Sequence, residues 1–284
     1  MKTSSDLHQA PAAIENRLTR RFAELRARGD KALIIYLTAG DPSLAETPGL
    51  LAEIARAGAD VIELGVPWSD PSADGVVIQH AMERALSTGG AAHDTVTKTL
   101  QAVRSFRAGS EVPLVLFGYY NPLLQRGLAR VVDEARSAGV DGMLVVDLPP
   151  EESGELDELL ARASLSRVPL LAPTTSPERA RAIAARGSGF AYYVALTGVT
   201  GAGHLDPVEV GRRTSVLRPS LAGLPLAVGF GVRDPESAHA LAPHCDAVVV
   251  GSALVQAIAA APDAATRLQV AFERVRALKQ ALTA

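Results

Sequence analysis

The chain has 284 residues, of which 48% are hydrophobic, and carries a formal net charge of −3 at pH 7. This composition supports a substantial buried core, whereas the lack of a clustered basic tract argues against nucleic acid or an anionic membrane surface as the main partner. The single cysteine, Cys245, fits a reducing compartment, and residues 1–13 lack the apolar core of a signal peptide, so we expect a cytoplasmic protein.

Short β-branched apolar runs alternate along the chain with stretches of helical period. We expect eight strands, at residues 33–38, 61–64, 113–117, 142–146, 169–172, 190–195, 226–228 and 247–250. Helical stretches lie between them, for example at residues 95–106, 124–138 and 151–163, and two extra helices are expected near 14–27 and 264–282. Strands that alternate with helices pair in parallel, and eight such units can close into a barrel. An open doubly wound sheet is the alternative, but it usually has fewer strands.

No linker, charge block or low-complexity segment divides the chain. We therefore predict a flexible segment at residues 1–13 and one α/β domain, a (β/α)8 TIM barrel, at residues 14–284. Turn-forming sequence follows each strand, such as TAGDP at 38–42, GVPWSDPSADG at 65–75 and YYNP at 119–122. These loops should meet at the C-terminal face of the barrel, where active sites of this fold lie.

Two carboxylates in different settings stand out. Glu63 interrupts the apolar run at 61–64, where burial is costly for an acid, and Asp74 lies in the polar loop that follows. Two acids in different environments can divide proton donation from proton removal. A structural interpretation exists for each: Glu63 can pair with a buried arginine inside the barrel, and Asp74 can serve as a turn former before Gly75.

Glycines after the last two strands indicate a phosphate site. Gly229 and Gly231 follow the seventh strand, and Gly251 and Ser252 follow the eighth, with Ser252 in a suitable place to cap the next helix. Glycine permits close approach of the backbone to an anion, and the N-terminus of a helix attracts negative charge. Gly201, after the sixth strand, can supply another backbone donor. The alternative is that these glycines only form tight turns.

Other barrel chemistries fit less well. The four lysines, Lys2, Lys31, Lys98 and Lys279, do not stand at strand ends, which disfavours Schiff-base chemistry. The six histidines are scattered without the spacing of a metal site, so we expect neither a metal nor another cofactor. Acid–base catalysis by Glu63 and Asp74 remains.

Five segments resemble the tryptophan synthase alpha chain family: TAGDP at 38–42, ELGVPWSDPSADG at 63–75, YYVALTGVTG at 192–201, GFGVRDPE at 229–236 and VVVGSALV at 248–255. The resemblance covers residues 33–260. It implies a lyase of tryptophan biosynthesis that cleaves indole-3-glycerol phosphate to indole and glyceraldehyde 3-phosphate. It also implies a beta-chain partner in an alpha2beta2 heterotetramer, in which the beta chain condenses indole with serine using pyridoxal phosphate.

The resemblance also implies a role for each matching position. Glu63 matches the general acid that protonates the indole ring, and Asp74 matches the carboxylate that binds the indole N–H. The other implied substrate-binding positions are Tyr36, Phe117, Tyr192, Thr200 and Phe230. The implied phosphate-binding positions are Gly201, Gly229, Gly231, Gly251 and Ser252.

Three positions in the loops depart from the family pattern: Trp68 replaces Phe or Tyr, Val76 replaces proline, and Gly203 replaces a frequent arginine. Because these departures affect loops, a stand-alone lyase that produces indole without a partner stays open. A non-catalytic activator of a beta chain is a second alternative, and the intact Glu63 and Asp74 argue against it because such a role does not need them. A phosphosugar isomerase on the same fold is a more distant alternative.

Overall fold

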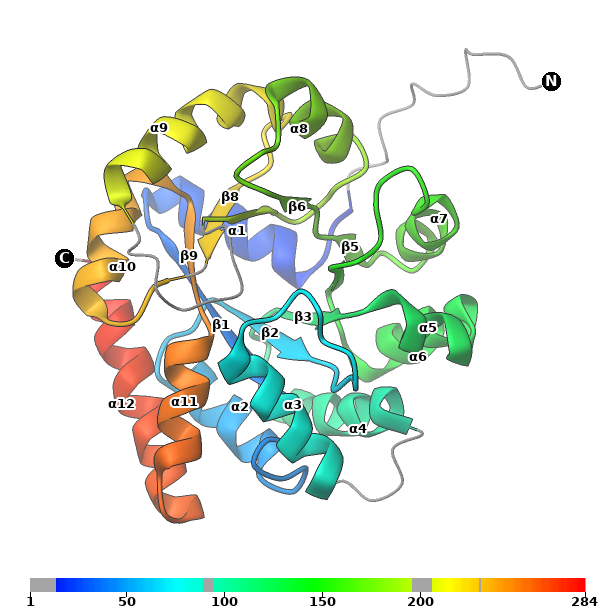
Figure 1. Ribbon diagram of the computed structural model, residues 1–284, viewed down its shortest axis with the longest axis vertical. Helices are drawn as coiled ribbons and strands as arrows, with labels where there is room; N and C mark the ends of the chain where they lie inside the picture. Colours follow the sequence, from blue (N-terminus) through cyan, green and yellow to red (C-terminus); the bar gives the residue numbers. More distant parts are fainter. Residues whose placement is uncertain (1–13, 89–93, 196–205, 230, 284) are drawn as a thin grey trace.

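The computed structural model describes residues 14–88, 94–195, 206–229 and 231–283. Nine strands form one parallel sheet, in the order β5-β4-β3-β2-β1-β9-β8-β7-β6. Figure 1 shows the helices arranged around these strands. The strands are β1 (Ala32–Thr38), β2 (Val61–Gly65), β3 (Leu114–Gly118), β4 (Gly142–Val145), β5 (Ser166–Arg167), β6 (Leu170–Leu171), β7 (Ala191–Val194), β8 (Leu226–Gly229) and β9 (Ala247–Val250).

The sheet closes into the predicted barrel through an interrupted strand. β5 pairs with β4 and β6 pairs with β7, and only Val168 and Pro169 separate them in the chain. Proline has no N–H to donate to a neighbouring strand, and this explains the break. The Val168 N–H still bonds to Met143 O (2.9 Å), whereas Pro169 O accepts from the Tyr192 N–H (2.8 Å) on the other side. The prediction of one strand at 169–172 was therefore wrong in its bounds.

The helices on the outside of the barrel follow the predicted alternation with two corrections. The stretch 124–138 forms two helices, because Gly127 takes a φ of 90° that interrupts the helix there. The helix predicted from residue 151 begins three residues later, at Gly154. The helices are α1 (Arg17–Arg28), α2 (Thr47–Arg56), α3 (Val76–Thr88), α4 (Thr95–Arg107), α5 (Tyr120–Arg126), α6 (Leu128–Ala138), α7 (Gly154–Arg162), α8 (Pro177–Ala184), α9 (Pro207–Leu217), α10 (Pro235–Leu241), α11 (Ser252–Ala260) and α12 (Ala264–Thr283).

Two apolar cores hold the molecule together. The larger one lies between the strands and the surrounding helices. The smaller one fills the inside of the barrel and includes Leu18, Phe22 and Leu25 of α1. The rings of Phe22 and Phe190 lie 5.4 Å apart, so α1 packs against the interior near the start of β7. This helix thereby covers the N-terminal end of the barrel.

Aspartates placed directly before three strands fix the lower end of the sheet. Each accepts the N–H of a residue in the neighbouring strand: Asp60 from Leu33 (2.7 Å), Asp141 from Leu114 (2.9 Å) and Asp246 from Leu226 (2.7 Å). Each aspartate also pairs with cations. Asp60 pairs with Arg21 and Lys279, Asp141 with Arg17 and Arg107, and Asp246 with Arg218. Charge-assisted bonds of this kind fix the register of neighbouring strands.

No helix in the described part of the chain is long and apolar enough to cross a membrane. The segment predicted to be flexible, residues 1–13, lies outside the described residues.

We expect Asp60→Asn to lower the free energy of unfolding by about 3 kcal/mol, because it removes the partner of two cations from a fully buried position. Urea denaturation measures the loss. The matched control is Asp30→Asn, whose pair with Arg28 is exposed and should contribute less than ~1 kcal/mol. Equal losses for the two variants would contradict this prediction.

Candidate active site

Glu63 lies inside the barrel near the C-terminal end of β2. In the sheet it stands beside Tyr36 of β1 and Val115 of β3. Its side chain is buried, and neither carboxyl oxygen has a hydrogen-bond partner among the residues that the structure describes. Burial raises the pKa of Glu63 from its ordinary value of 4.5 to about 8. The described residues therefore exclude the structural pairing with a buried arginine, and the group is a protonated acid at neutral pH.

Asp74 lies in the loop between β2 and α3, and its side chain is also buried. The hydroxyl of Tyr119 donates to Asp74 Oδ2 at 2.7 Å. Burial raises the pKa of Asp74 to about 6, and the bond from Tyr119 opposes this rise. The turn interpretation explains the backbone of Asp74, whose N–H bonds to Pro71 O, but it does not explain a buried carboxylate.

Two contacts from α3 reach loops at this face of the barrel. Gln79 Nε2 donates to the backbone oxygen of Asp74 at 2.8 Å. Further along α3, Arg84 makes a two-pronged ion pair with Asp41, in the loop after β1 (2.8 and 2.9 Å). The helix that follows Asp74 is therefore tied to a neighbouring loop at the same face of the barrel.

Tyr119 is the site residue that the sequence analysis missed. It is buried directly after β3, in the YYNP segment that was assigned to the C-terminal face. The signal in the sequence was its place at the end of a strand, but a tyrosine in a turn segment does not by itself indicate a carboxylate partner. The contact with Asp74 depends on how the loop after β2 folds back.

Three of the predicted substrate-binding side chains line the inside of the barrel around the acids. Tyr36 of β1, Phe117 of β3 and Tyr192 of β7 all belong to the interior core. The rings of Tyr36 and Phe117 meet edge to face at 5.2 Å. Burial raises the pKa of Tyr192, and the charges of Glu63 and Asp74 raise it further, which places this phenol within electrostatic reach of both acids.

Each of the two tyrosines extends over a glycine of the next strand. A Cβ at Gly65 of β2 would overlap the hydroxyl of Tyr36, and a Cβ at Gly229 of β8 would overlap the hydroxyl of Tyr192. Gly229 was predicted for phosphate binding, and the structure gives it this second reason to lack a side chain. Other residues at these two positions would displace the tyrosines.

The predicted phosphate-binding residues stand at the ends of neighbouring strands, since β8 pairs with β9. Gly231 has a φ of 90°, which a residue other than glycine rarely adopts. Gly251, not Ser252, is the N-cap of α11, so the prediction of Ser252 as the cap was wrong; among the described residues, no side chain caps this end of the helix. An N-terminus without a side-chain cap leaves backbone N–H groups available to an anion.

Three predicted site residues, Thr200, Gly201 and Phe230, lie outside the described residues. Within the described part, no cluster of three or more His, Cys, Asp or Glu side chains could hold a metal ion.

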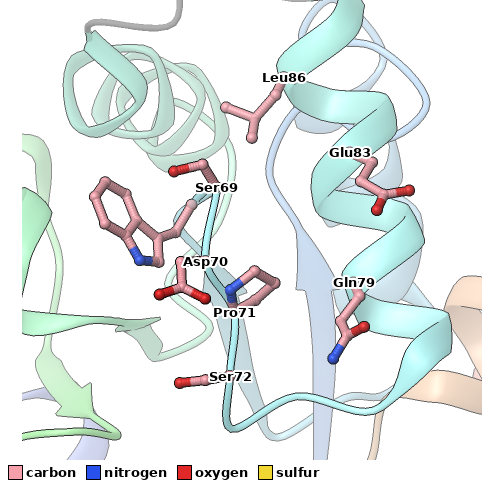
Figure 2. Close-up of a pocket in the computed structure, with 8 residues that line it drawn as sticks. Ser69, Asp70, Pro71, Ser72, Gln79, Glu83 and Leu86 are labelled. Carbon is pink, nitrogen blue, oxygen red and sulfur yellow. The ribbon is translucent and has the colours of Figure 1, made fainter.

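A separate cavity of about 240 Å³ lies between the loop after β2 and α3. Figure 2 shows Asp70 and Ser72 on the loop side and Gln79, Glu83 and Leu86 on the helix side. Neither Glu63 nor Asp74 lines this cavity. It is therefore distinct from the site inside the barrel.

Known proteins resemble the chain along nearly its whole length. A family model described as tryptophan synthase alpha chain matches residues 22–283. The tryptophan synthase alpha chain of Methylococcus capsulatus is 53% identical over 249 residues, covering 87% of this chain and 91% of that protein. The alpha chain of Laribacter hongkongensis is 49% identical over 263 residues, with 92% and 98% covered.

Solved structures agree with this. The crystal structure of tryptophan synthase subunit alpha from Legionella pneumophila superposes with a TM-score of 0.85 at 38% identity, covering 95% of this chain and 99% of that one. A chain of Mycobacterium tuberculosis tryptophan synthase superposes with a TM-score of 0.82 at 33% identity, covering 95% and 99%.

We expect Glu63→Gln to gain stability over the unmodified protein as the pH rises from 4.5 to 8. In this range the unfolded chain loses the Glu63 proton while the folded chain keeps it, so the stability of the unmodified protein falls as the pH approaches about 8. The difference in unfolding free energy between the two proteins should grow by ~4 kcal/mol across the range, measured by urea denaturation at several pH values. The exposed Glu178→Gln is the control. A difference for Glu63→Gln that stays constant with pH would show that Glu63 ionises normally in the fold.

Proposed function

The chain belongs to the tryptophan synthase alpha chain family, and we propose that Glu63 and Asp74 divide the proton transfer and charge stabilisation of its reaction between them. The protein is the alpha subunit of tryptophan synthase, a carbon–carbon lyase of tryptophan biosynthesis that cleaves indole-3-glycerol phosphate to indole and glyceraldehyde 3-phosphate. Its partner is the beta chain. The observation that carries the assignment of roles is the difference between two buried carboxyl groups, one without a partner and one held by a hydroxyl.

Glu63 acts first, as the general acid. An indole carbanion is a poor leaving group, so the ring carbon that bears the side chain must be protonated before the carbon–carbon bond breaks. A carboxyl group with a pKa of about 8 is protonated at neutral pH and needs no desolvation when substrate enters. The Glu63 carboxylate that remains then accepts the proton of the substrate hydroxyl as that bond breaks, which restores the acid for the next cycle.

Asp74 stabilises the charge that this step creates. Protonation of the ring carbon places a positive charge on the indole, and a carboxylate at the ring N–H offsets it. Because the pKa of Asp74 is about 6, below that of Glu63, Asp74 is ionised at neutral pH while Glu63 still holds its proton. This order supports the assignment of the acid and of the anion.

The remaining predicted residues bind the two ends of the substrate. Tyr36, Phe117 and Tyr192 form apolar walls around the acids, where a flat aromatic ring fits. Gly229, Gly231 and Gly251, with the backbone of Ser252 at the start of α11, bind the phosphate. The roles of Thr200, Gly201 and Phe230 rest on the resemblance alone.

Three further proposals concern the protein as a whole. We propose an alpha2beta2 assembly, a cytoplasmic location, and a single domain spanning residues 14–284. The cysteine content supports the location, because Cys245 is the single cysteine of the sequence and the fold does not depend on an internal disulfide.

Indole release from indole-3-glycerol phosphate tests the function. We expect slow release by the purified chain, strong acceleration when a beta chain is added, and a loss of at least ~1,000-fold in Glu63→Gln, because glutamine cannot donate the proton. Glu178→Gln should release indole at the unmodified rate. Fast release without a beta chain would favour the stand-alone lyase, and normal release by Glu63→Gln would refute the role of Glu63.

The pH dependence of kcat/KM tests the pair of roles. The active form holds a proton on Glu63 and none on Asp74, so activity should rise with pH through about 6 and fall above about 8. Asp74→Asn should lower the maximal kcat/KM and remove the rise in activity near pH 6. A profile that keeps this rise in Asp74→Asn would assign it to another group.

A further inference from the structure

The hydroxyl of Tyr119 stands at the centre of a short chain of hydrogen bonds. It accepts the backbone N–H of Ala73 at 3.0 Å and lies 2.7 Å from Asp74 Oδ2. An amide N–H can only donate, so the Tyr119 oxygen is the acceptor in the first bond. The single phenolic proton is then free to donate to the carboxylate. The second bond runs from the hydroxyl to Asp74 when Asp74 is ionised, because a carboxylate can only accept.

We propose that Tyr119 is a positioning residue for Asp74. The hydroxyl of Tyr119 binds the loop at two successive residues, Ala73 and Asp74, and holds the Asp74 carboxylate as an acceptor for the substrate's N–H. This inference rests on the proposed role of Asp74. It adds a residue that the comparisons do not assign and that the sequence analysis did not select.

The geometry fits a positioning role. Tyr119 follows β3, so its backbone belongs to the rigid barrel, whereas Asp74 lies in the loop after β2. A bond from the barrel to one carboxylate oxygen fixes the rotation of the Asp74 side chain and leaves the other oxygen for a ligand. The second bond, to Ala73, stops the loop from moving away with the carboxylate attached.

The electrostatic surroundings make this donor important. Among the described residues, the titratable groups that interact electrostatically with Asp74 or with the Tyr119 hydroxyl are Tyr36 of β1, Tyr192 of β7 and Asp147 after β4. All of these are acids, and none can offset a negative charge on Asp74. Burial raises the pKa of Asp74, and in the described structure the bond from Tyr119 is the resolved contact that lowers it. Without this bond the ionised form of Asp74 loses its stabilising partner.

The alternative is that Tyr119 only anchors the loop through Ala73. In that case its loss would lower activity equally at every pH and leave the ionisation of Asp74 unchanged. The two roles for Tyr119 therefore predict different values for the Asp74 pKa, which can be measured without substrate.

The experiment measures the Asp74 pKa in the ligand-free chain by carbon-13 NMR of labelled aspartate carboxyl groups, with Asp74→Asn to assign the signal. We expect Tyr119→Phe to raise this pKa by ~1 pH unit and to lower kcat/KM at pH 7 by ~10-fold, with the activity limb near pH 6 moving upward by the same amount. The limb near pH 8, which belongs to Glu63, should not move. Tyr120→Phe, the same change at the next residue, is the matched control and should leave both values unchanged.

A second variant should shift the Asp74 pKa in the opposite direction. Replacement of Tyr119 by 3-fluorotyrosine keeps the ring and makes the hydroxyl a stronger donor, so the Asp74 pKa should fall. An Asp74 pKa that is unchanged in both variants would overturn the inference. An Asp74 pKa that moves while the activity limb does not would instead overturn the assigned role of Asp74 in the reaction.

Discussion

An unpaired carboxyl group inside an apolar barrel is the feature on which the rest of the structure depends. Glu63 has no hydrogen-bond partner in the described structure, and its ionised form is therefore expensive. The apolar interior core keeps this group protonated, because it offers the charged form no solvation. Helix α1 adds to this by packing three apolar side chains into the lower interior, which keeps water from the N-terminal end.

The two halves of the site are built by the same packing arrangement. Tyr36 extends from β1 over Gly65 of β2, and Tyr192 extends from β7 over Gly229 of β8. In each case a glycine on the neighbouring strand makes room for a phenol inside the barrel. Both phenols belong to the interior core of the barrel, where side chains with few rotamers surround Glu63. This packing also buries Glu63.

Much of this could be predicted from the sequence, and the exceptions have physical causes. The strand alternation and the place of Glu63 follow from local patterns, because an acid in an apolar run is visible without a structure. The break between β5 and β6 depends on which neighbour each N–H meets, and Pro169 decides this only once the barrel closes. Gly251 rather than Ser252 caps α11, since the backbone at the cap takes a conformation that sequence does not specify. Tyr119 could not be found because its contact with Asp74 joins segments 45 residues apart.

The break at Val168 and Pro169 also separates the two groups of residues to which the proposed function gives different roles. Both acids and Tyr119 precede it in the chain, whereas Gly229, Gly231 and Gly251 follow it. In the proposed function, proton transfer thus belongs to the first half of the barrel and phosphate binding to the second. The two halves meet through covalent continuity and the pairing of β1 with β9. With that division of roles, mutations that change the reacting group of a substrate can accumulate in one half while the other half keeps its phosphate site, which would make this barrel a modular starting point for the evolution of new specificities.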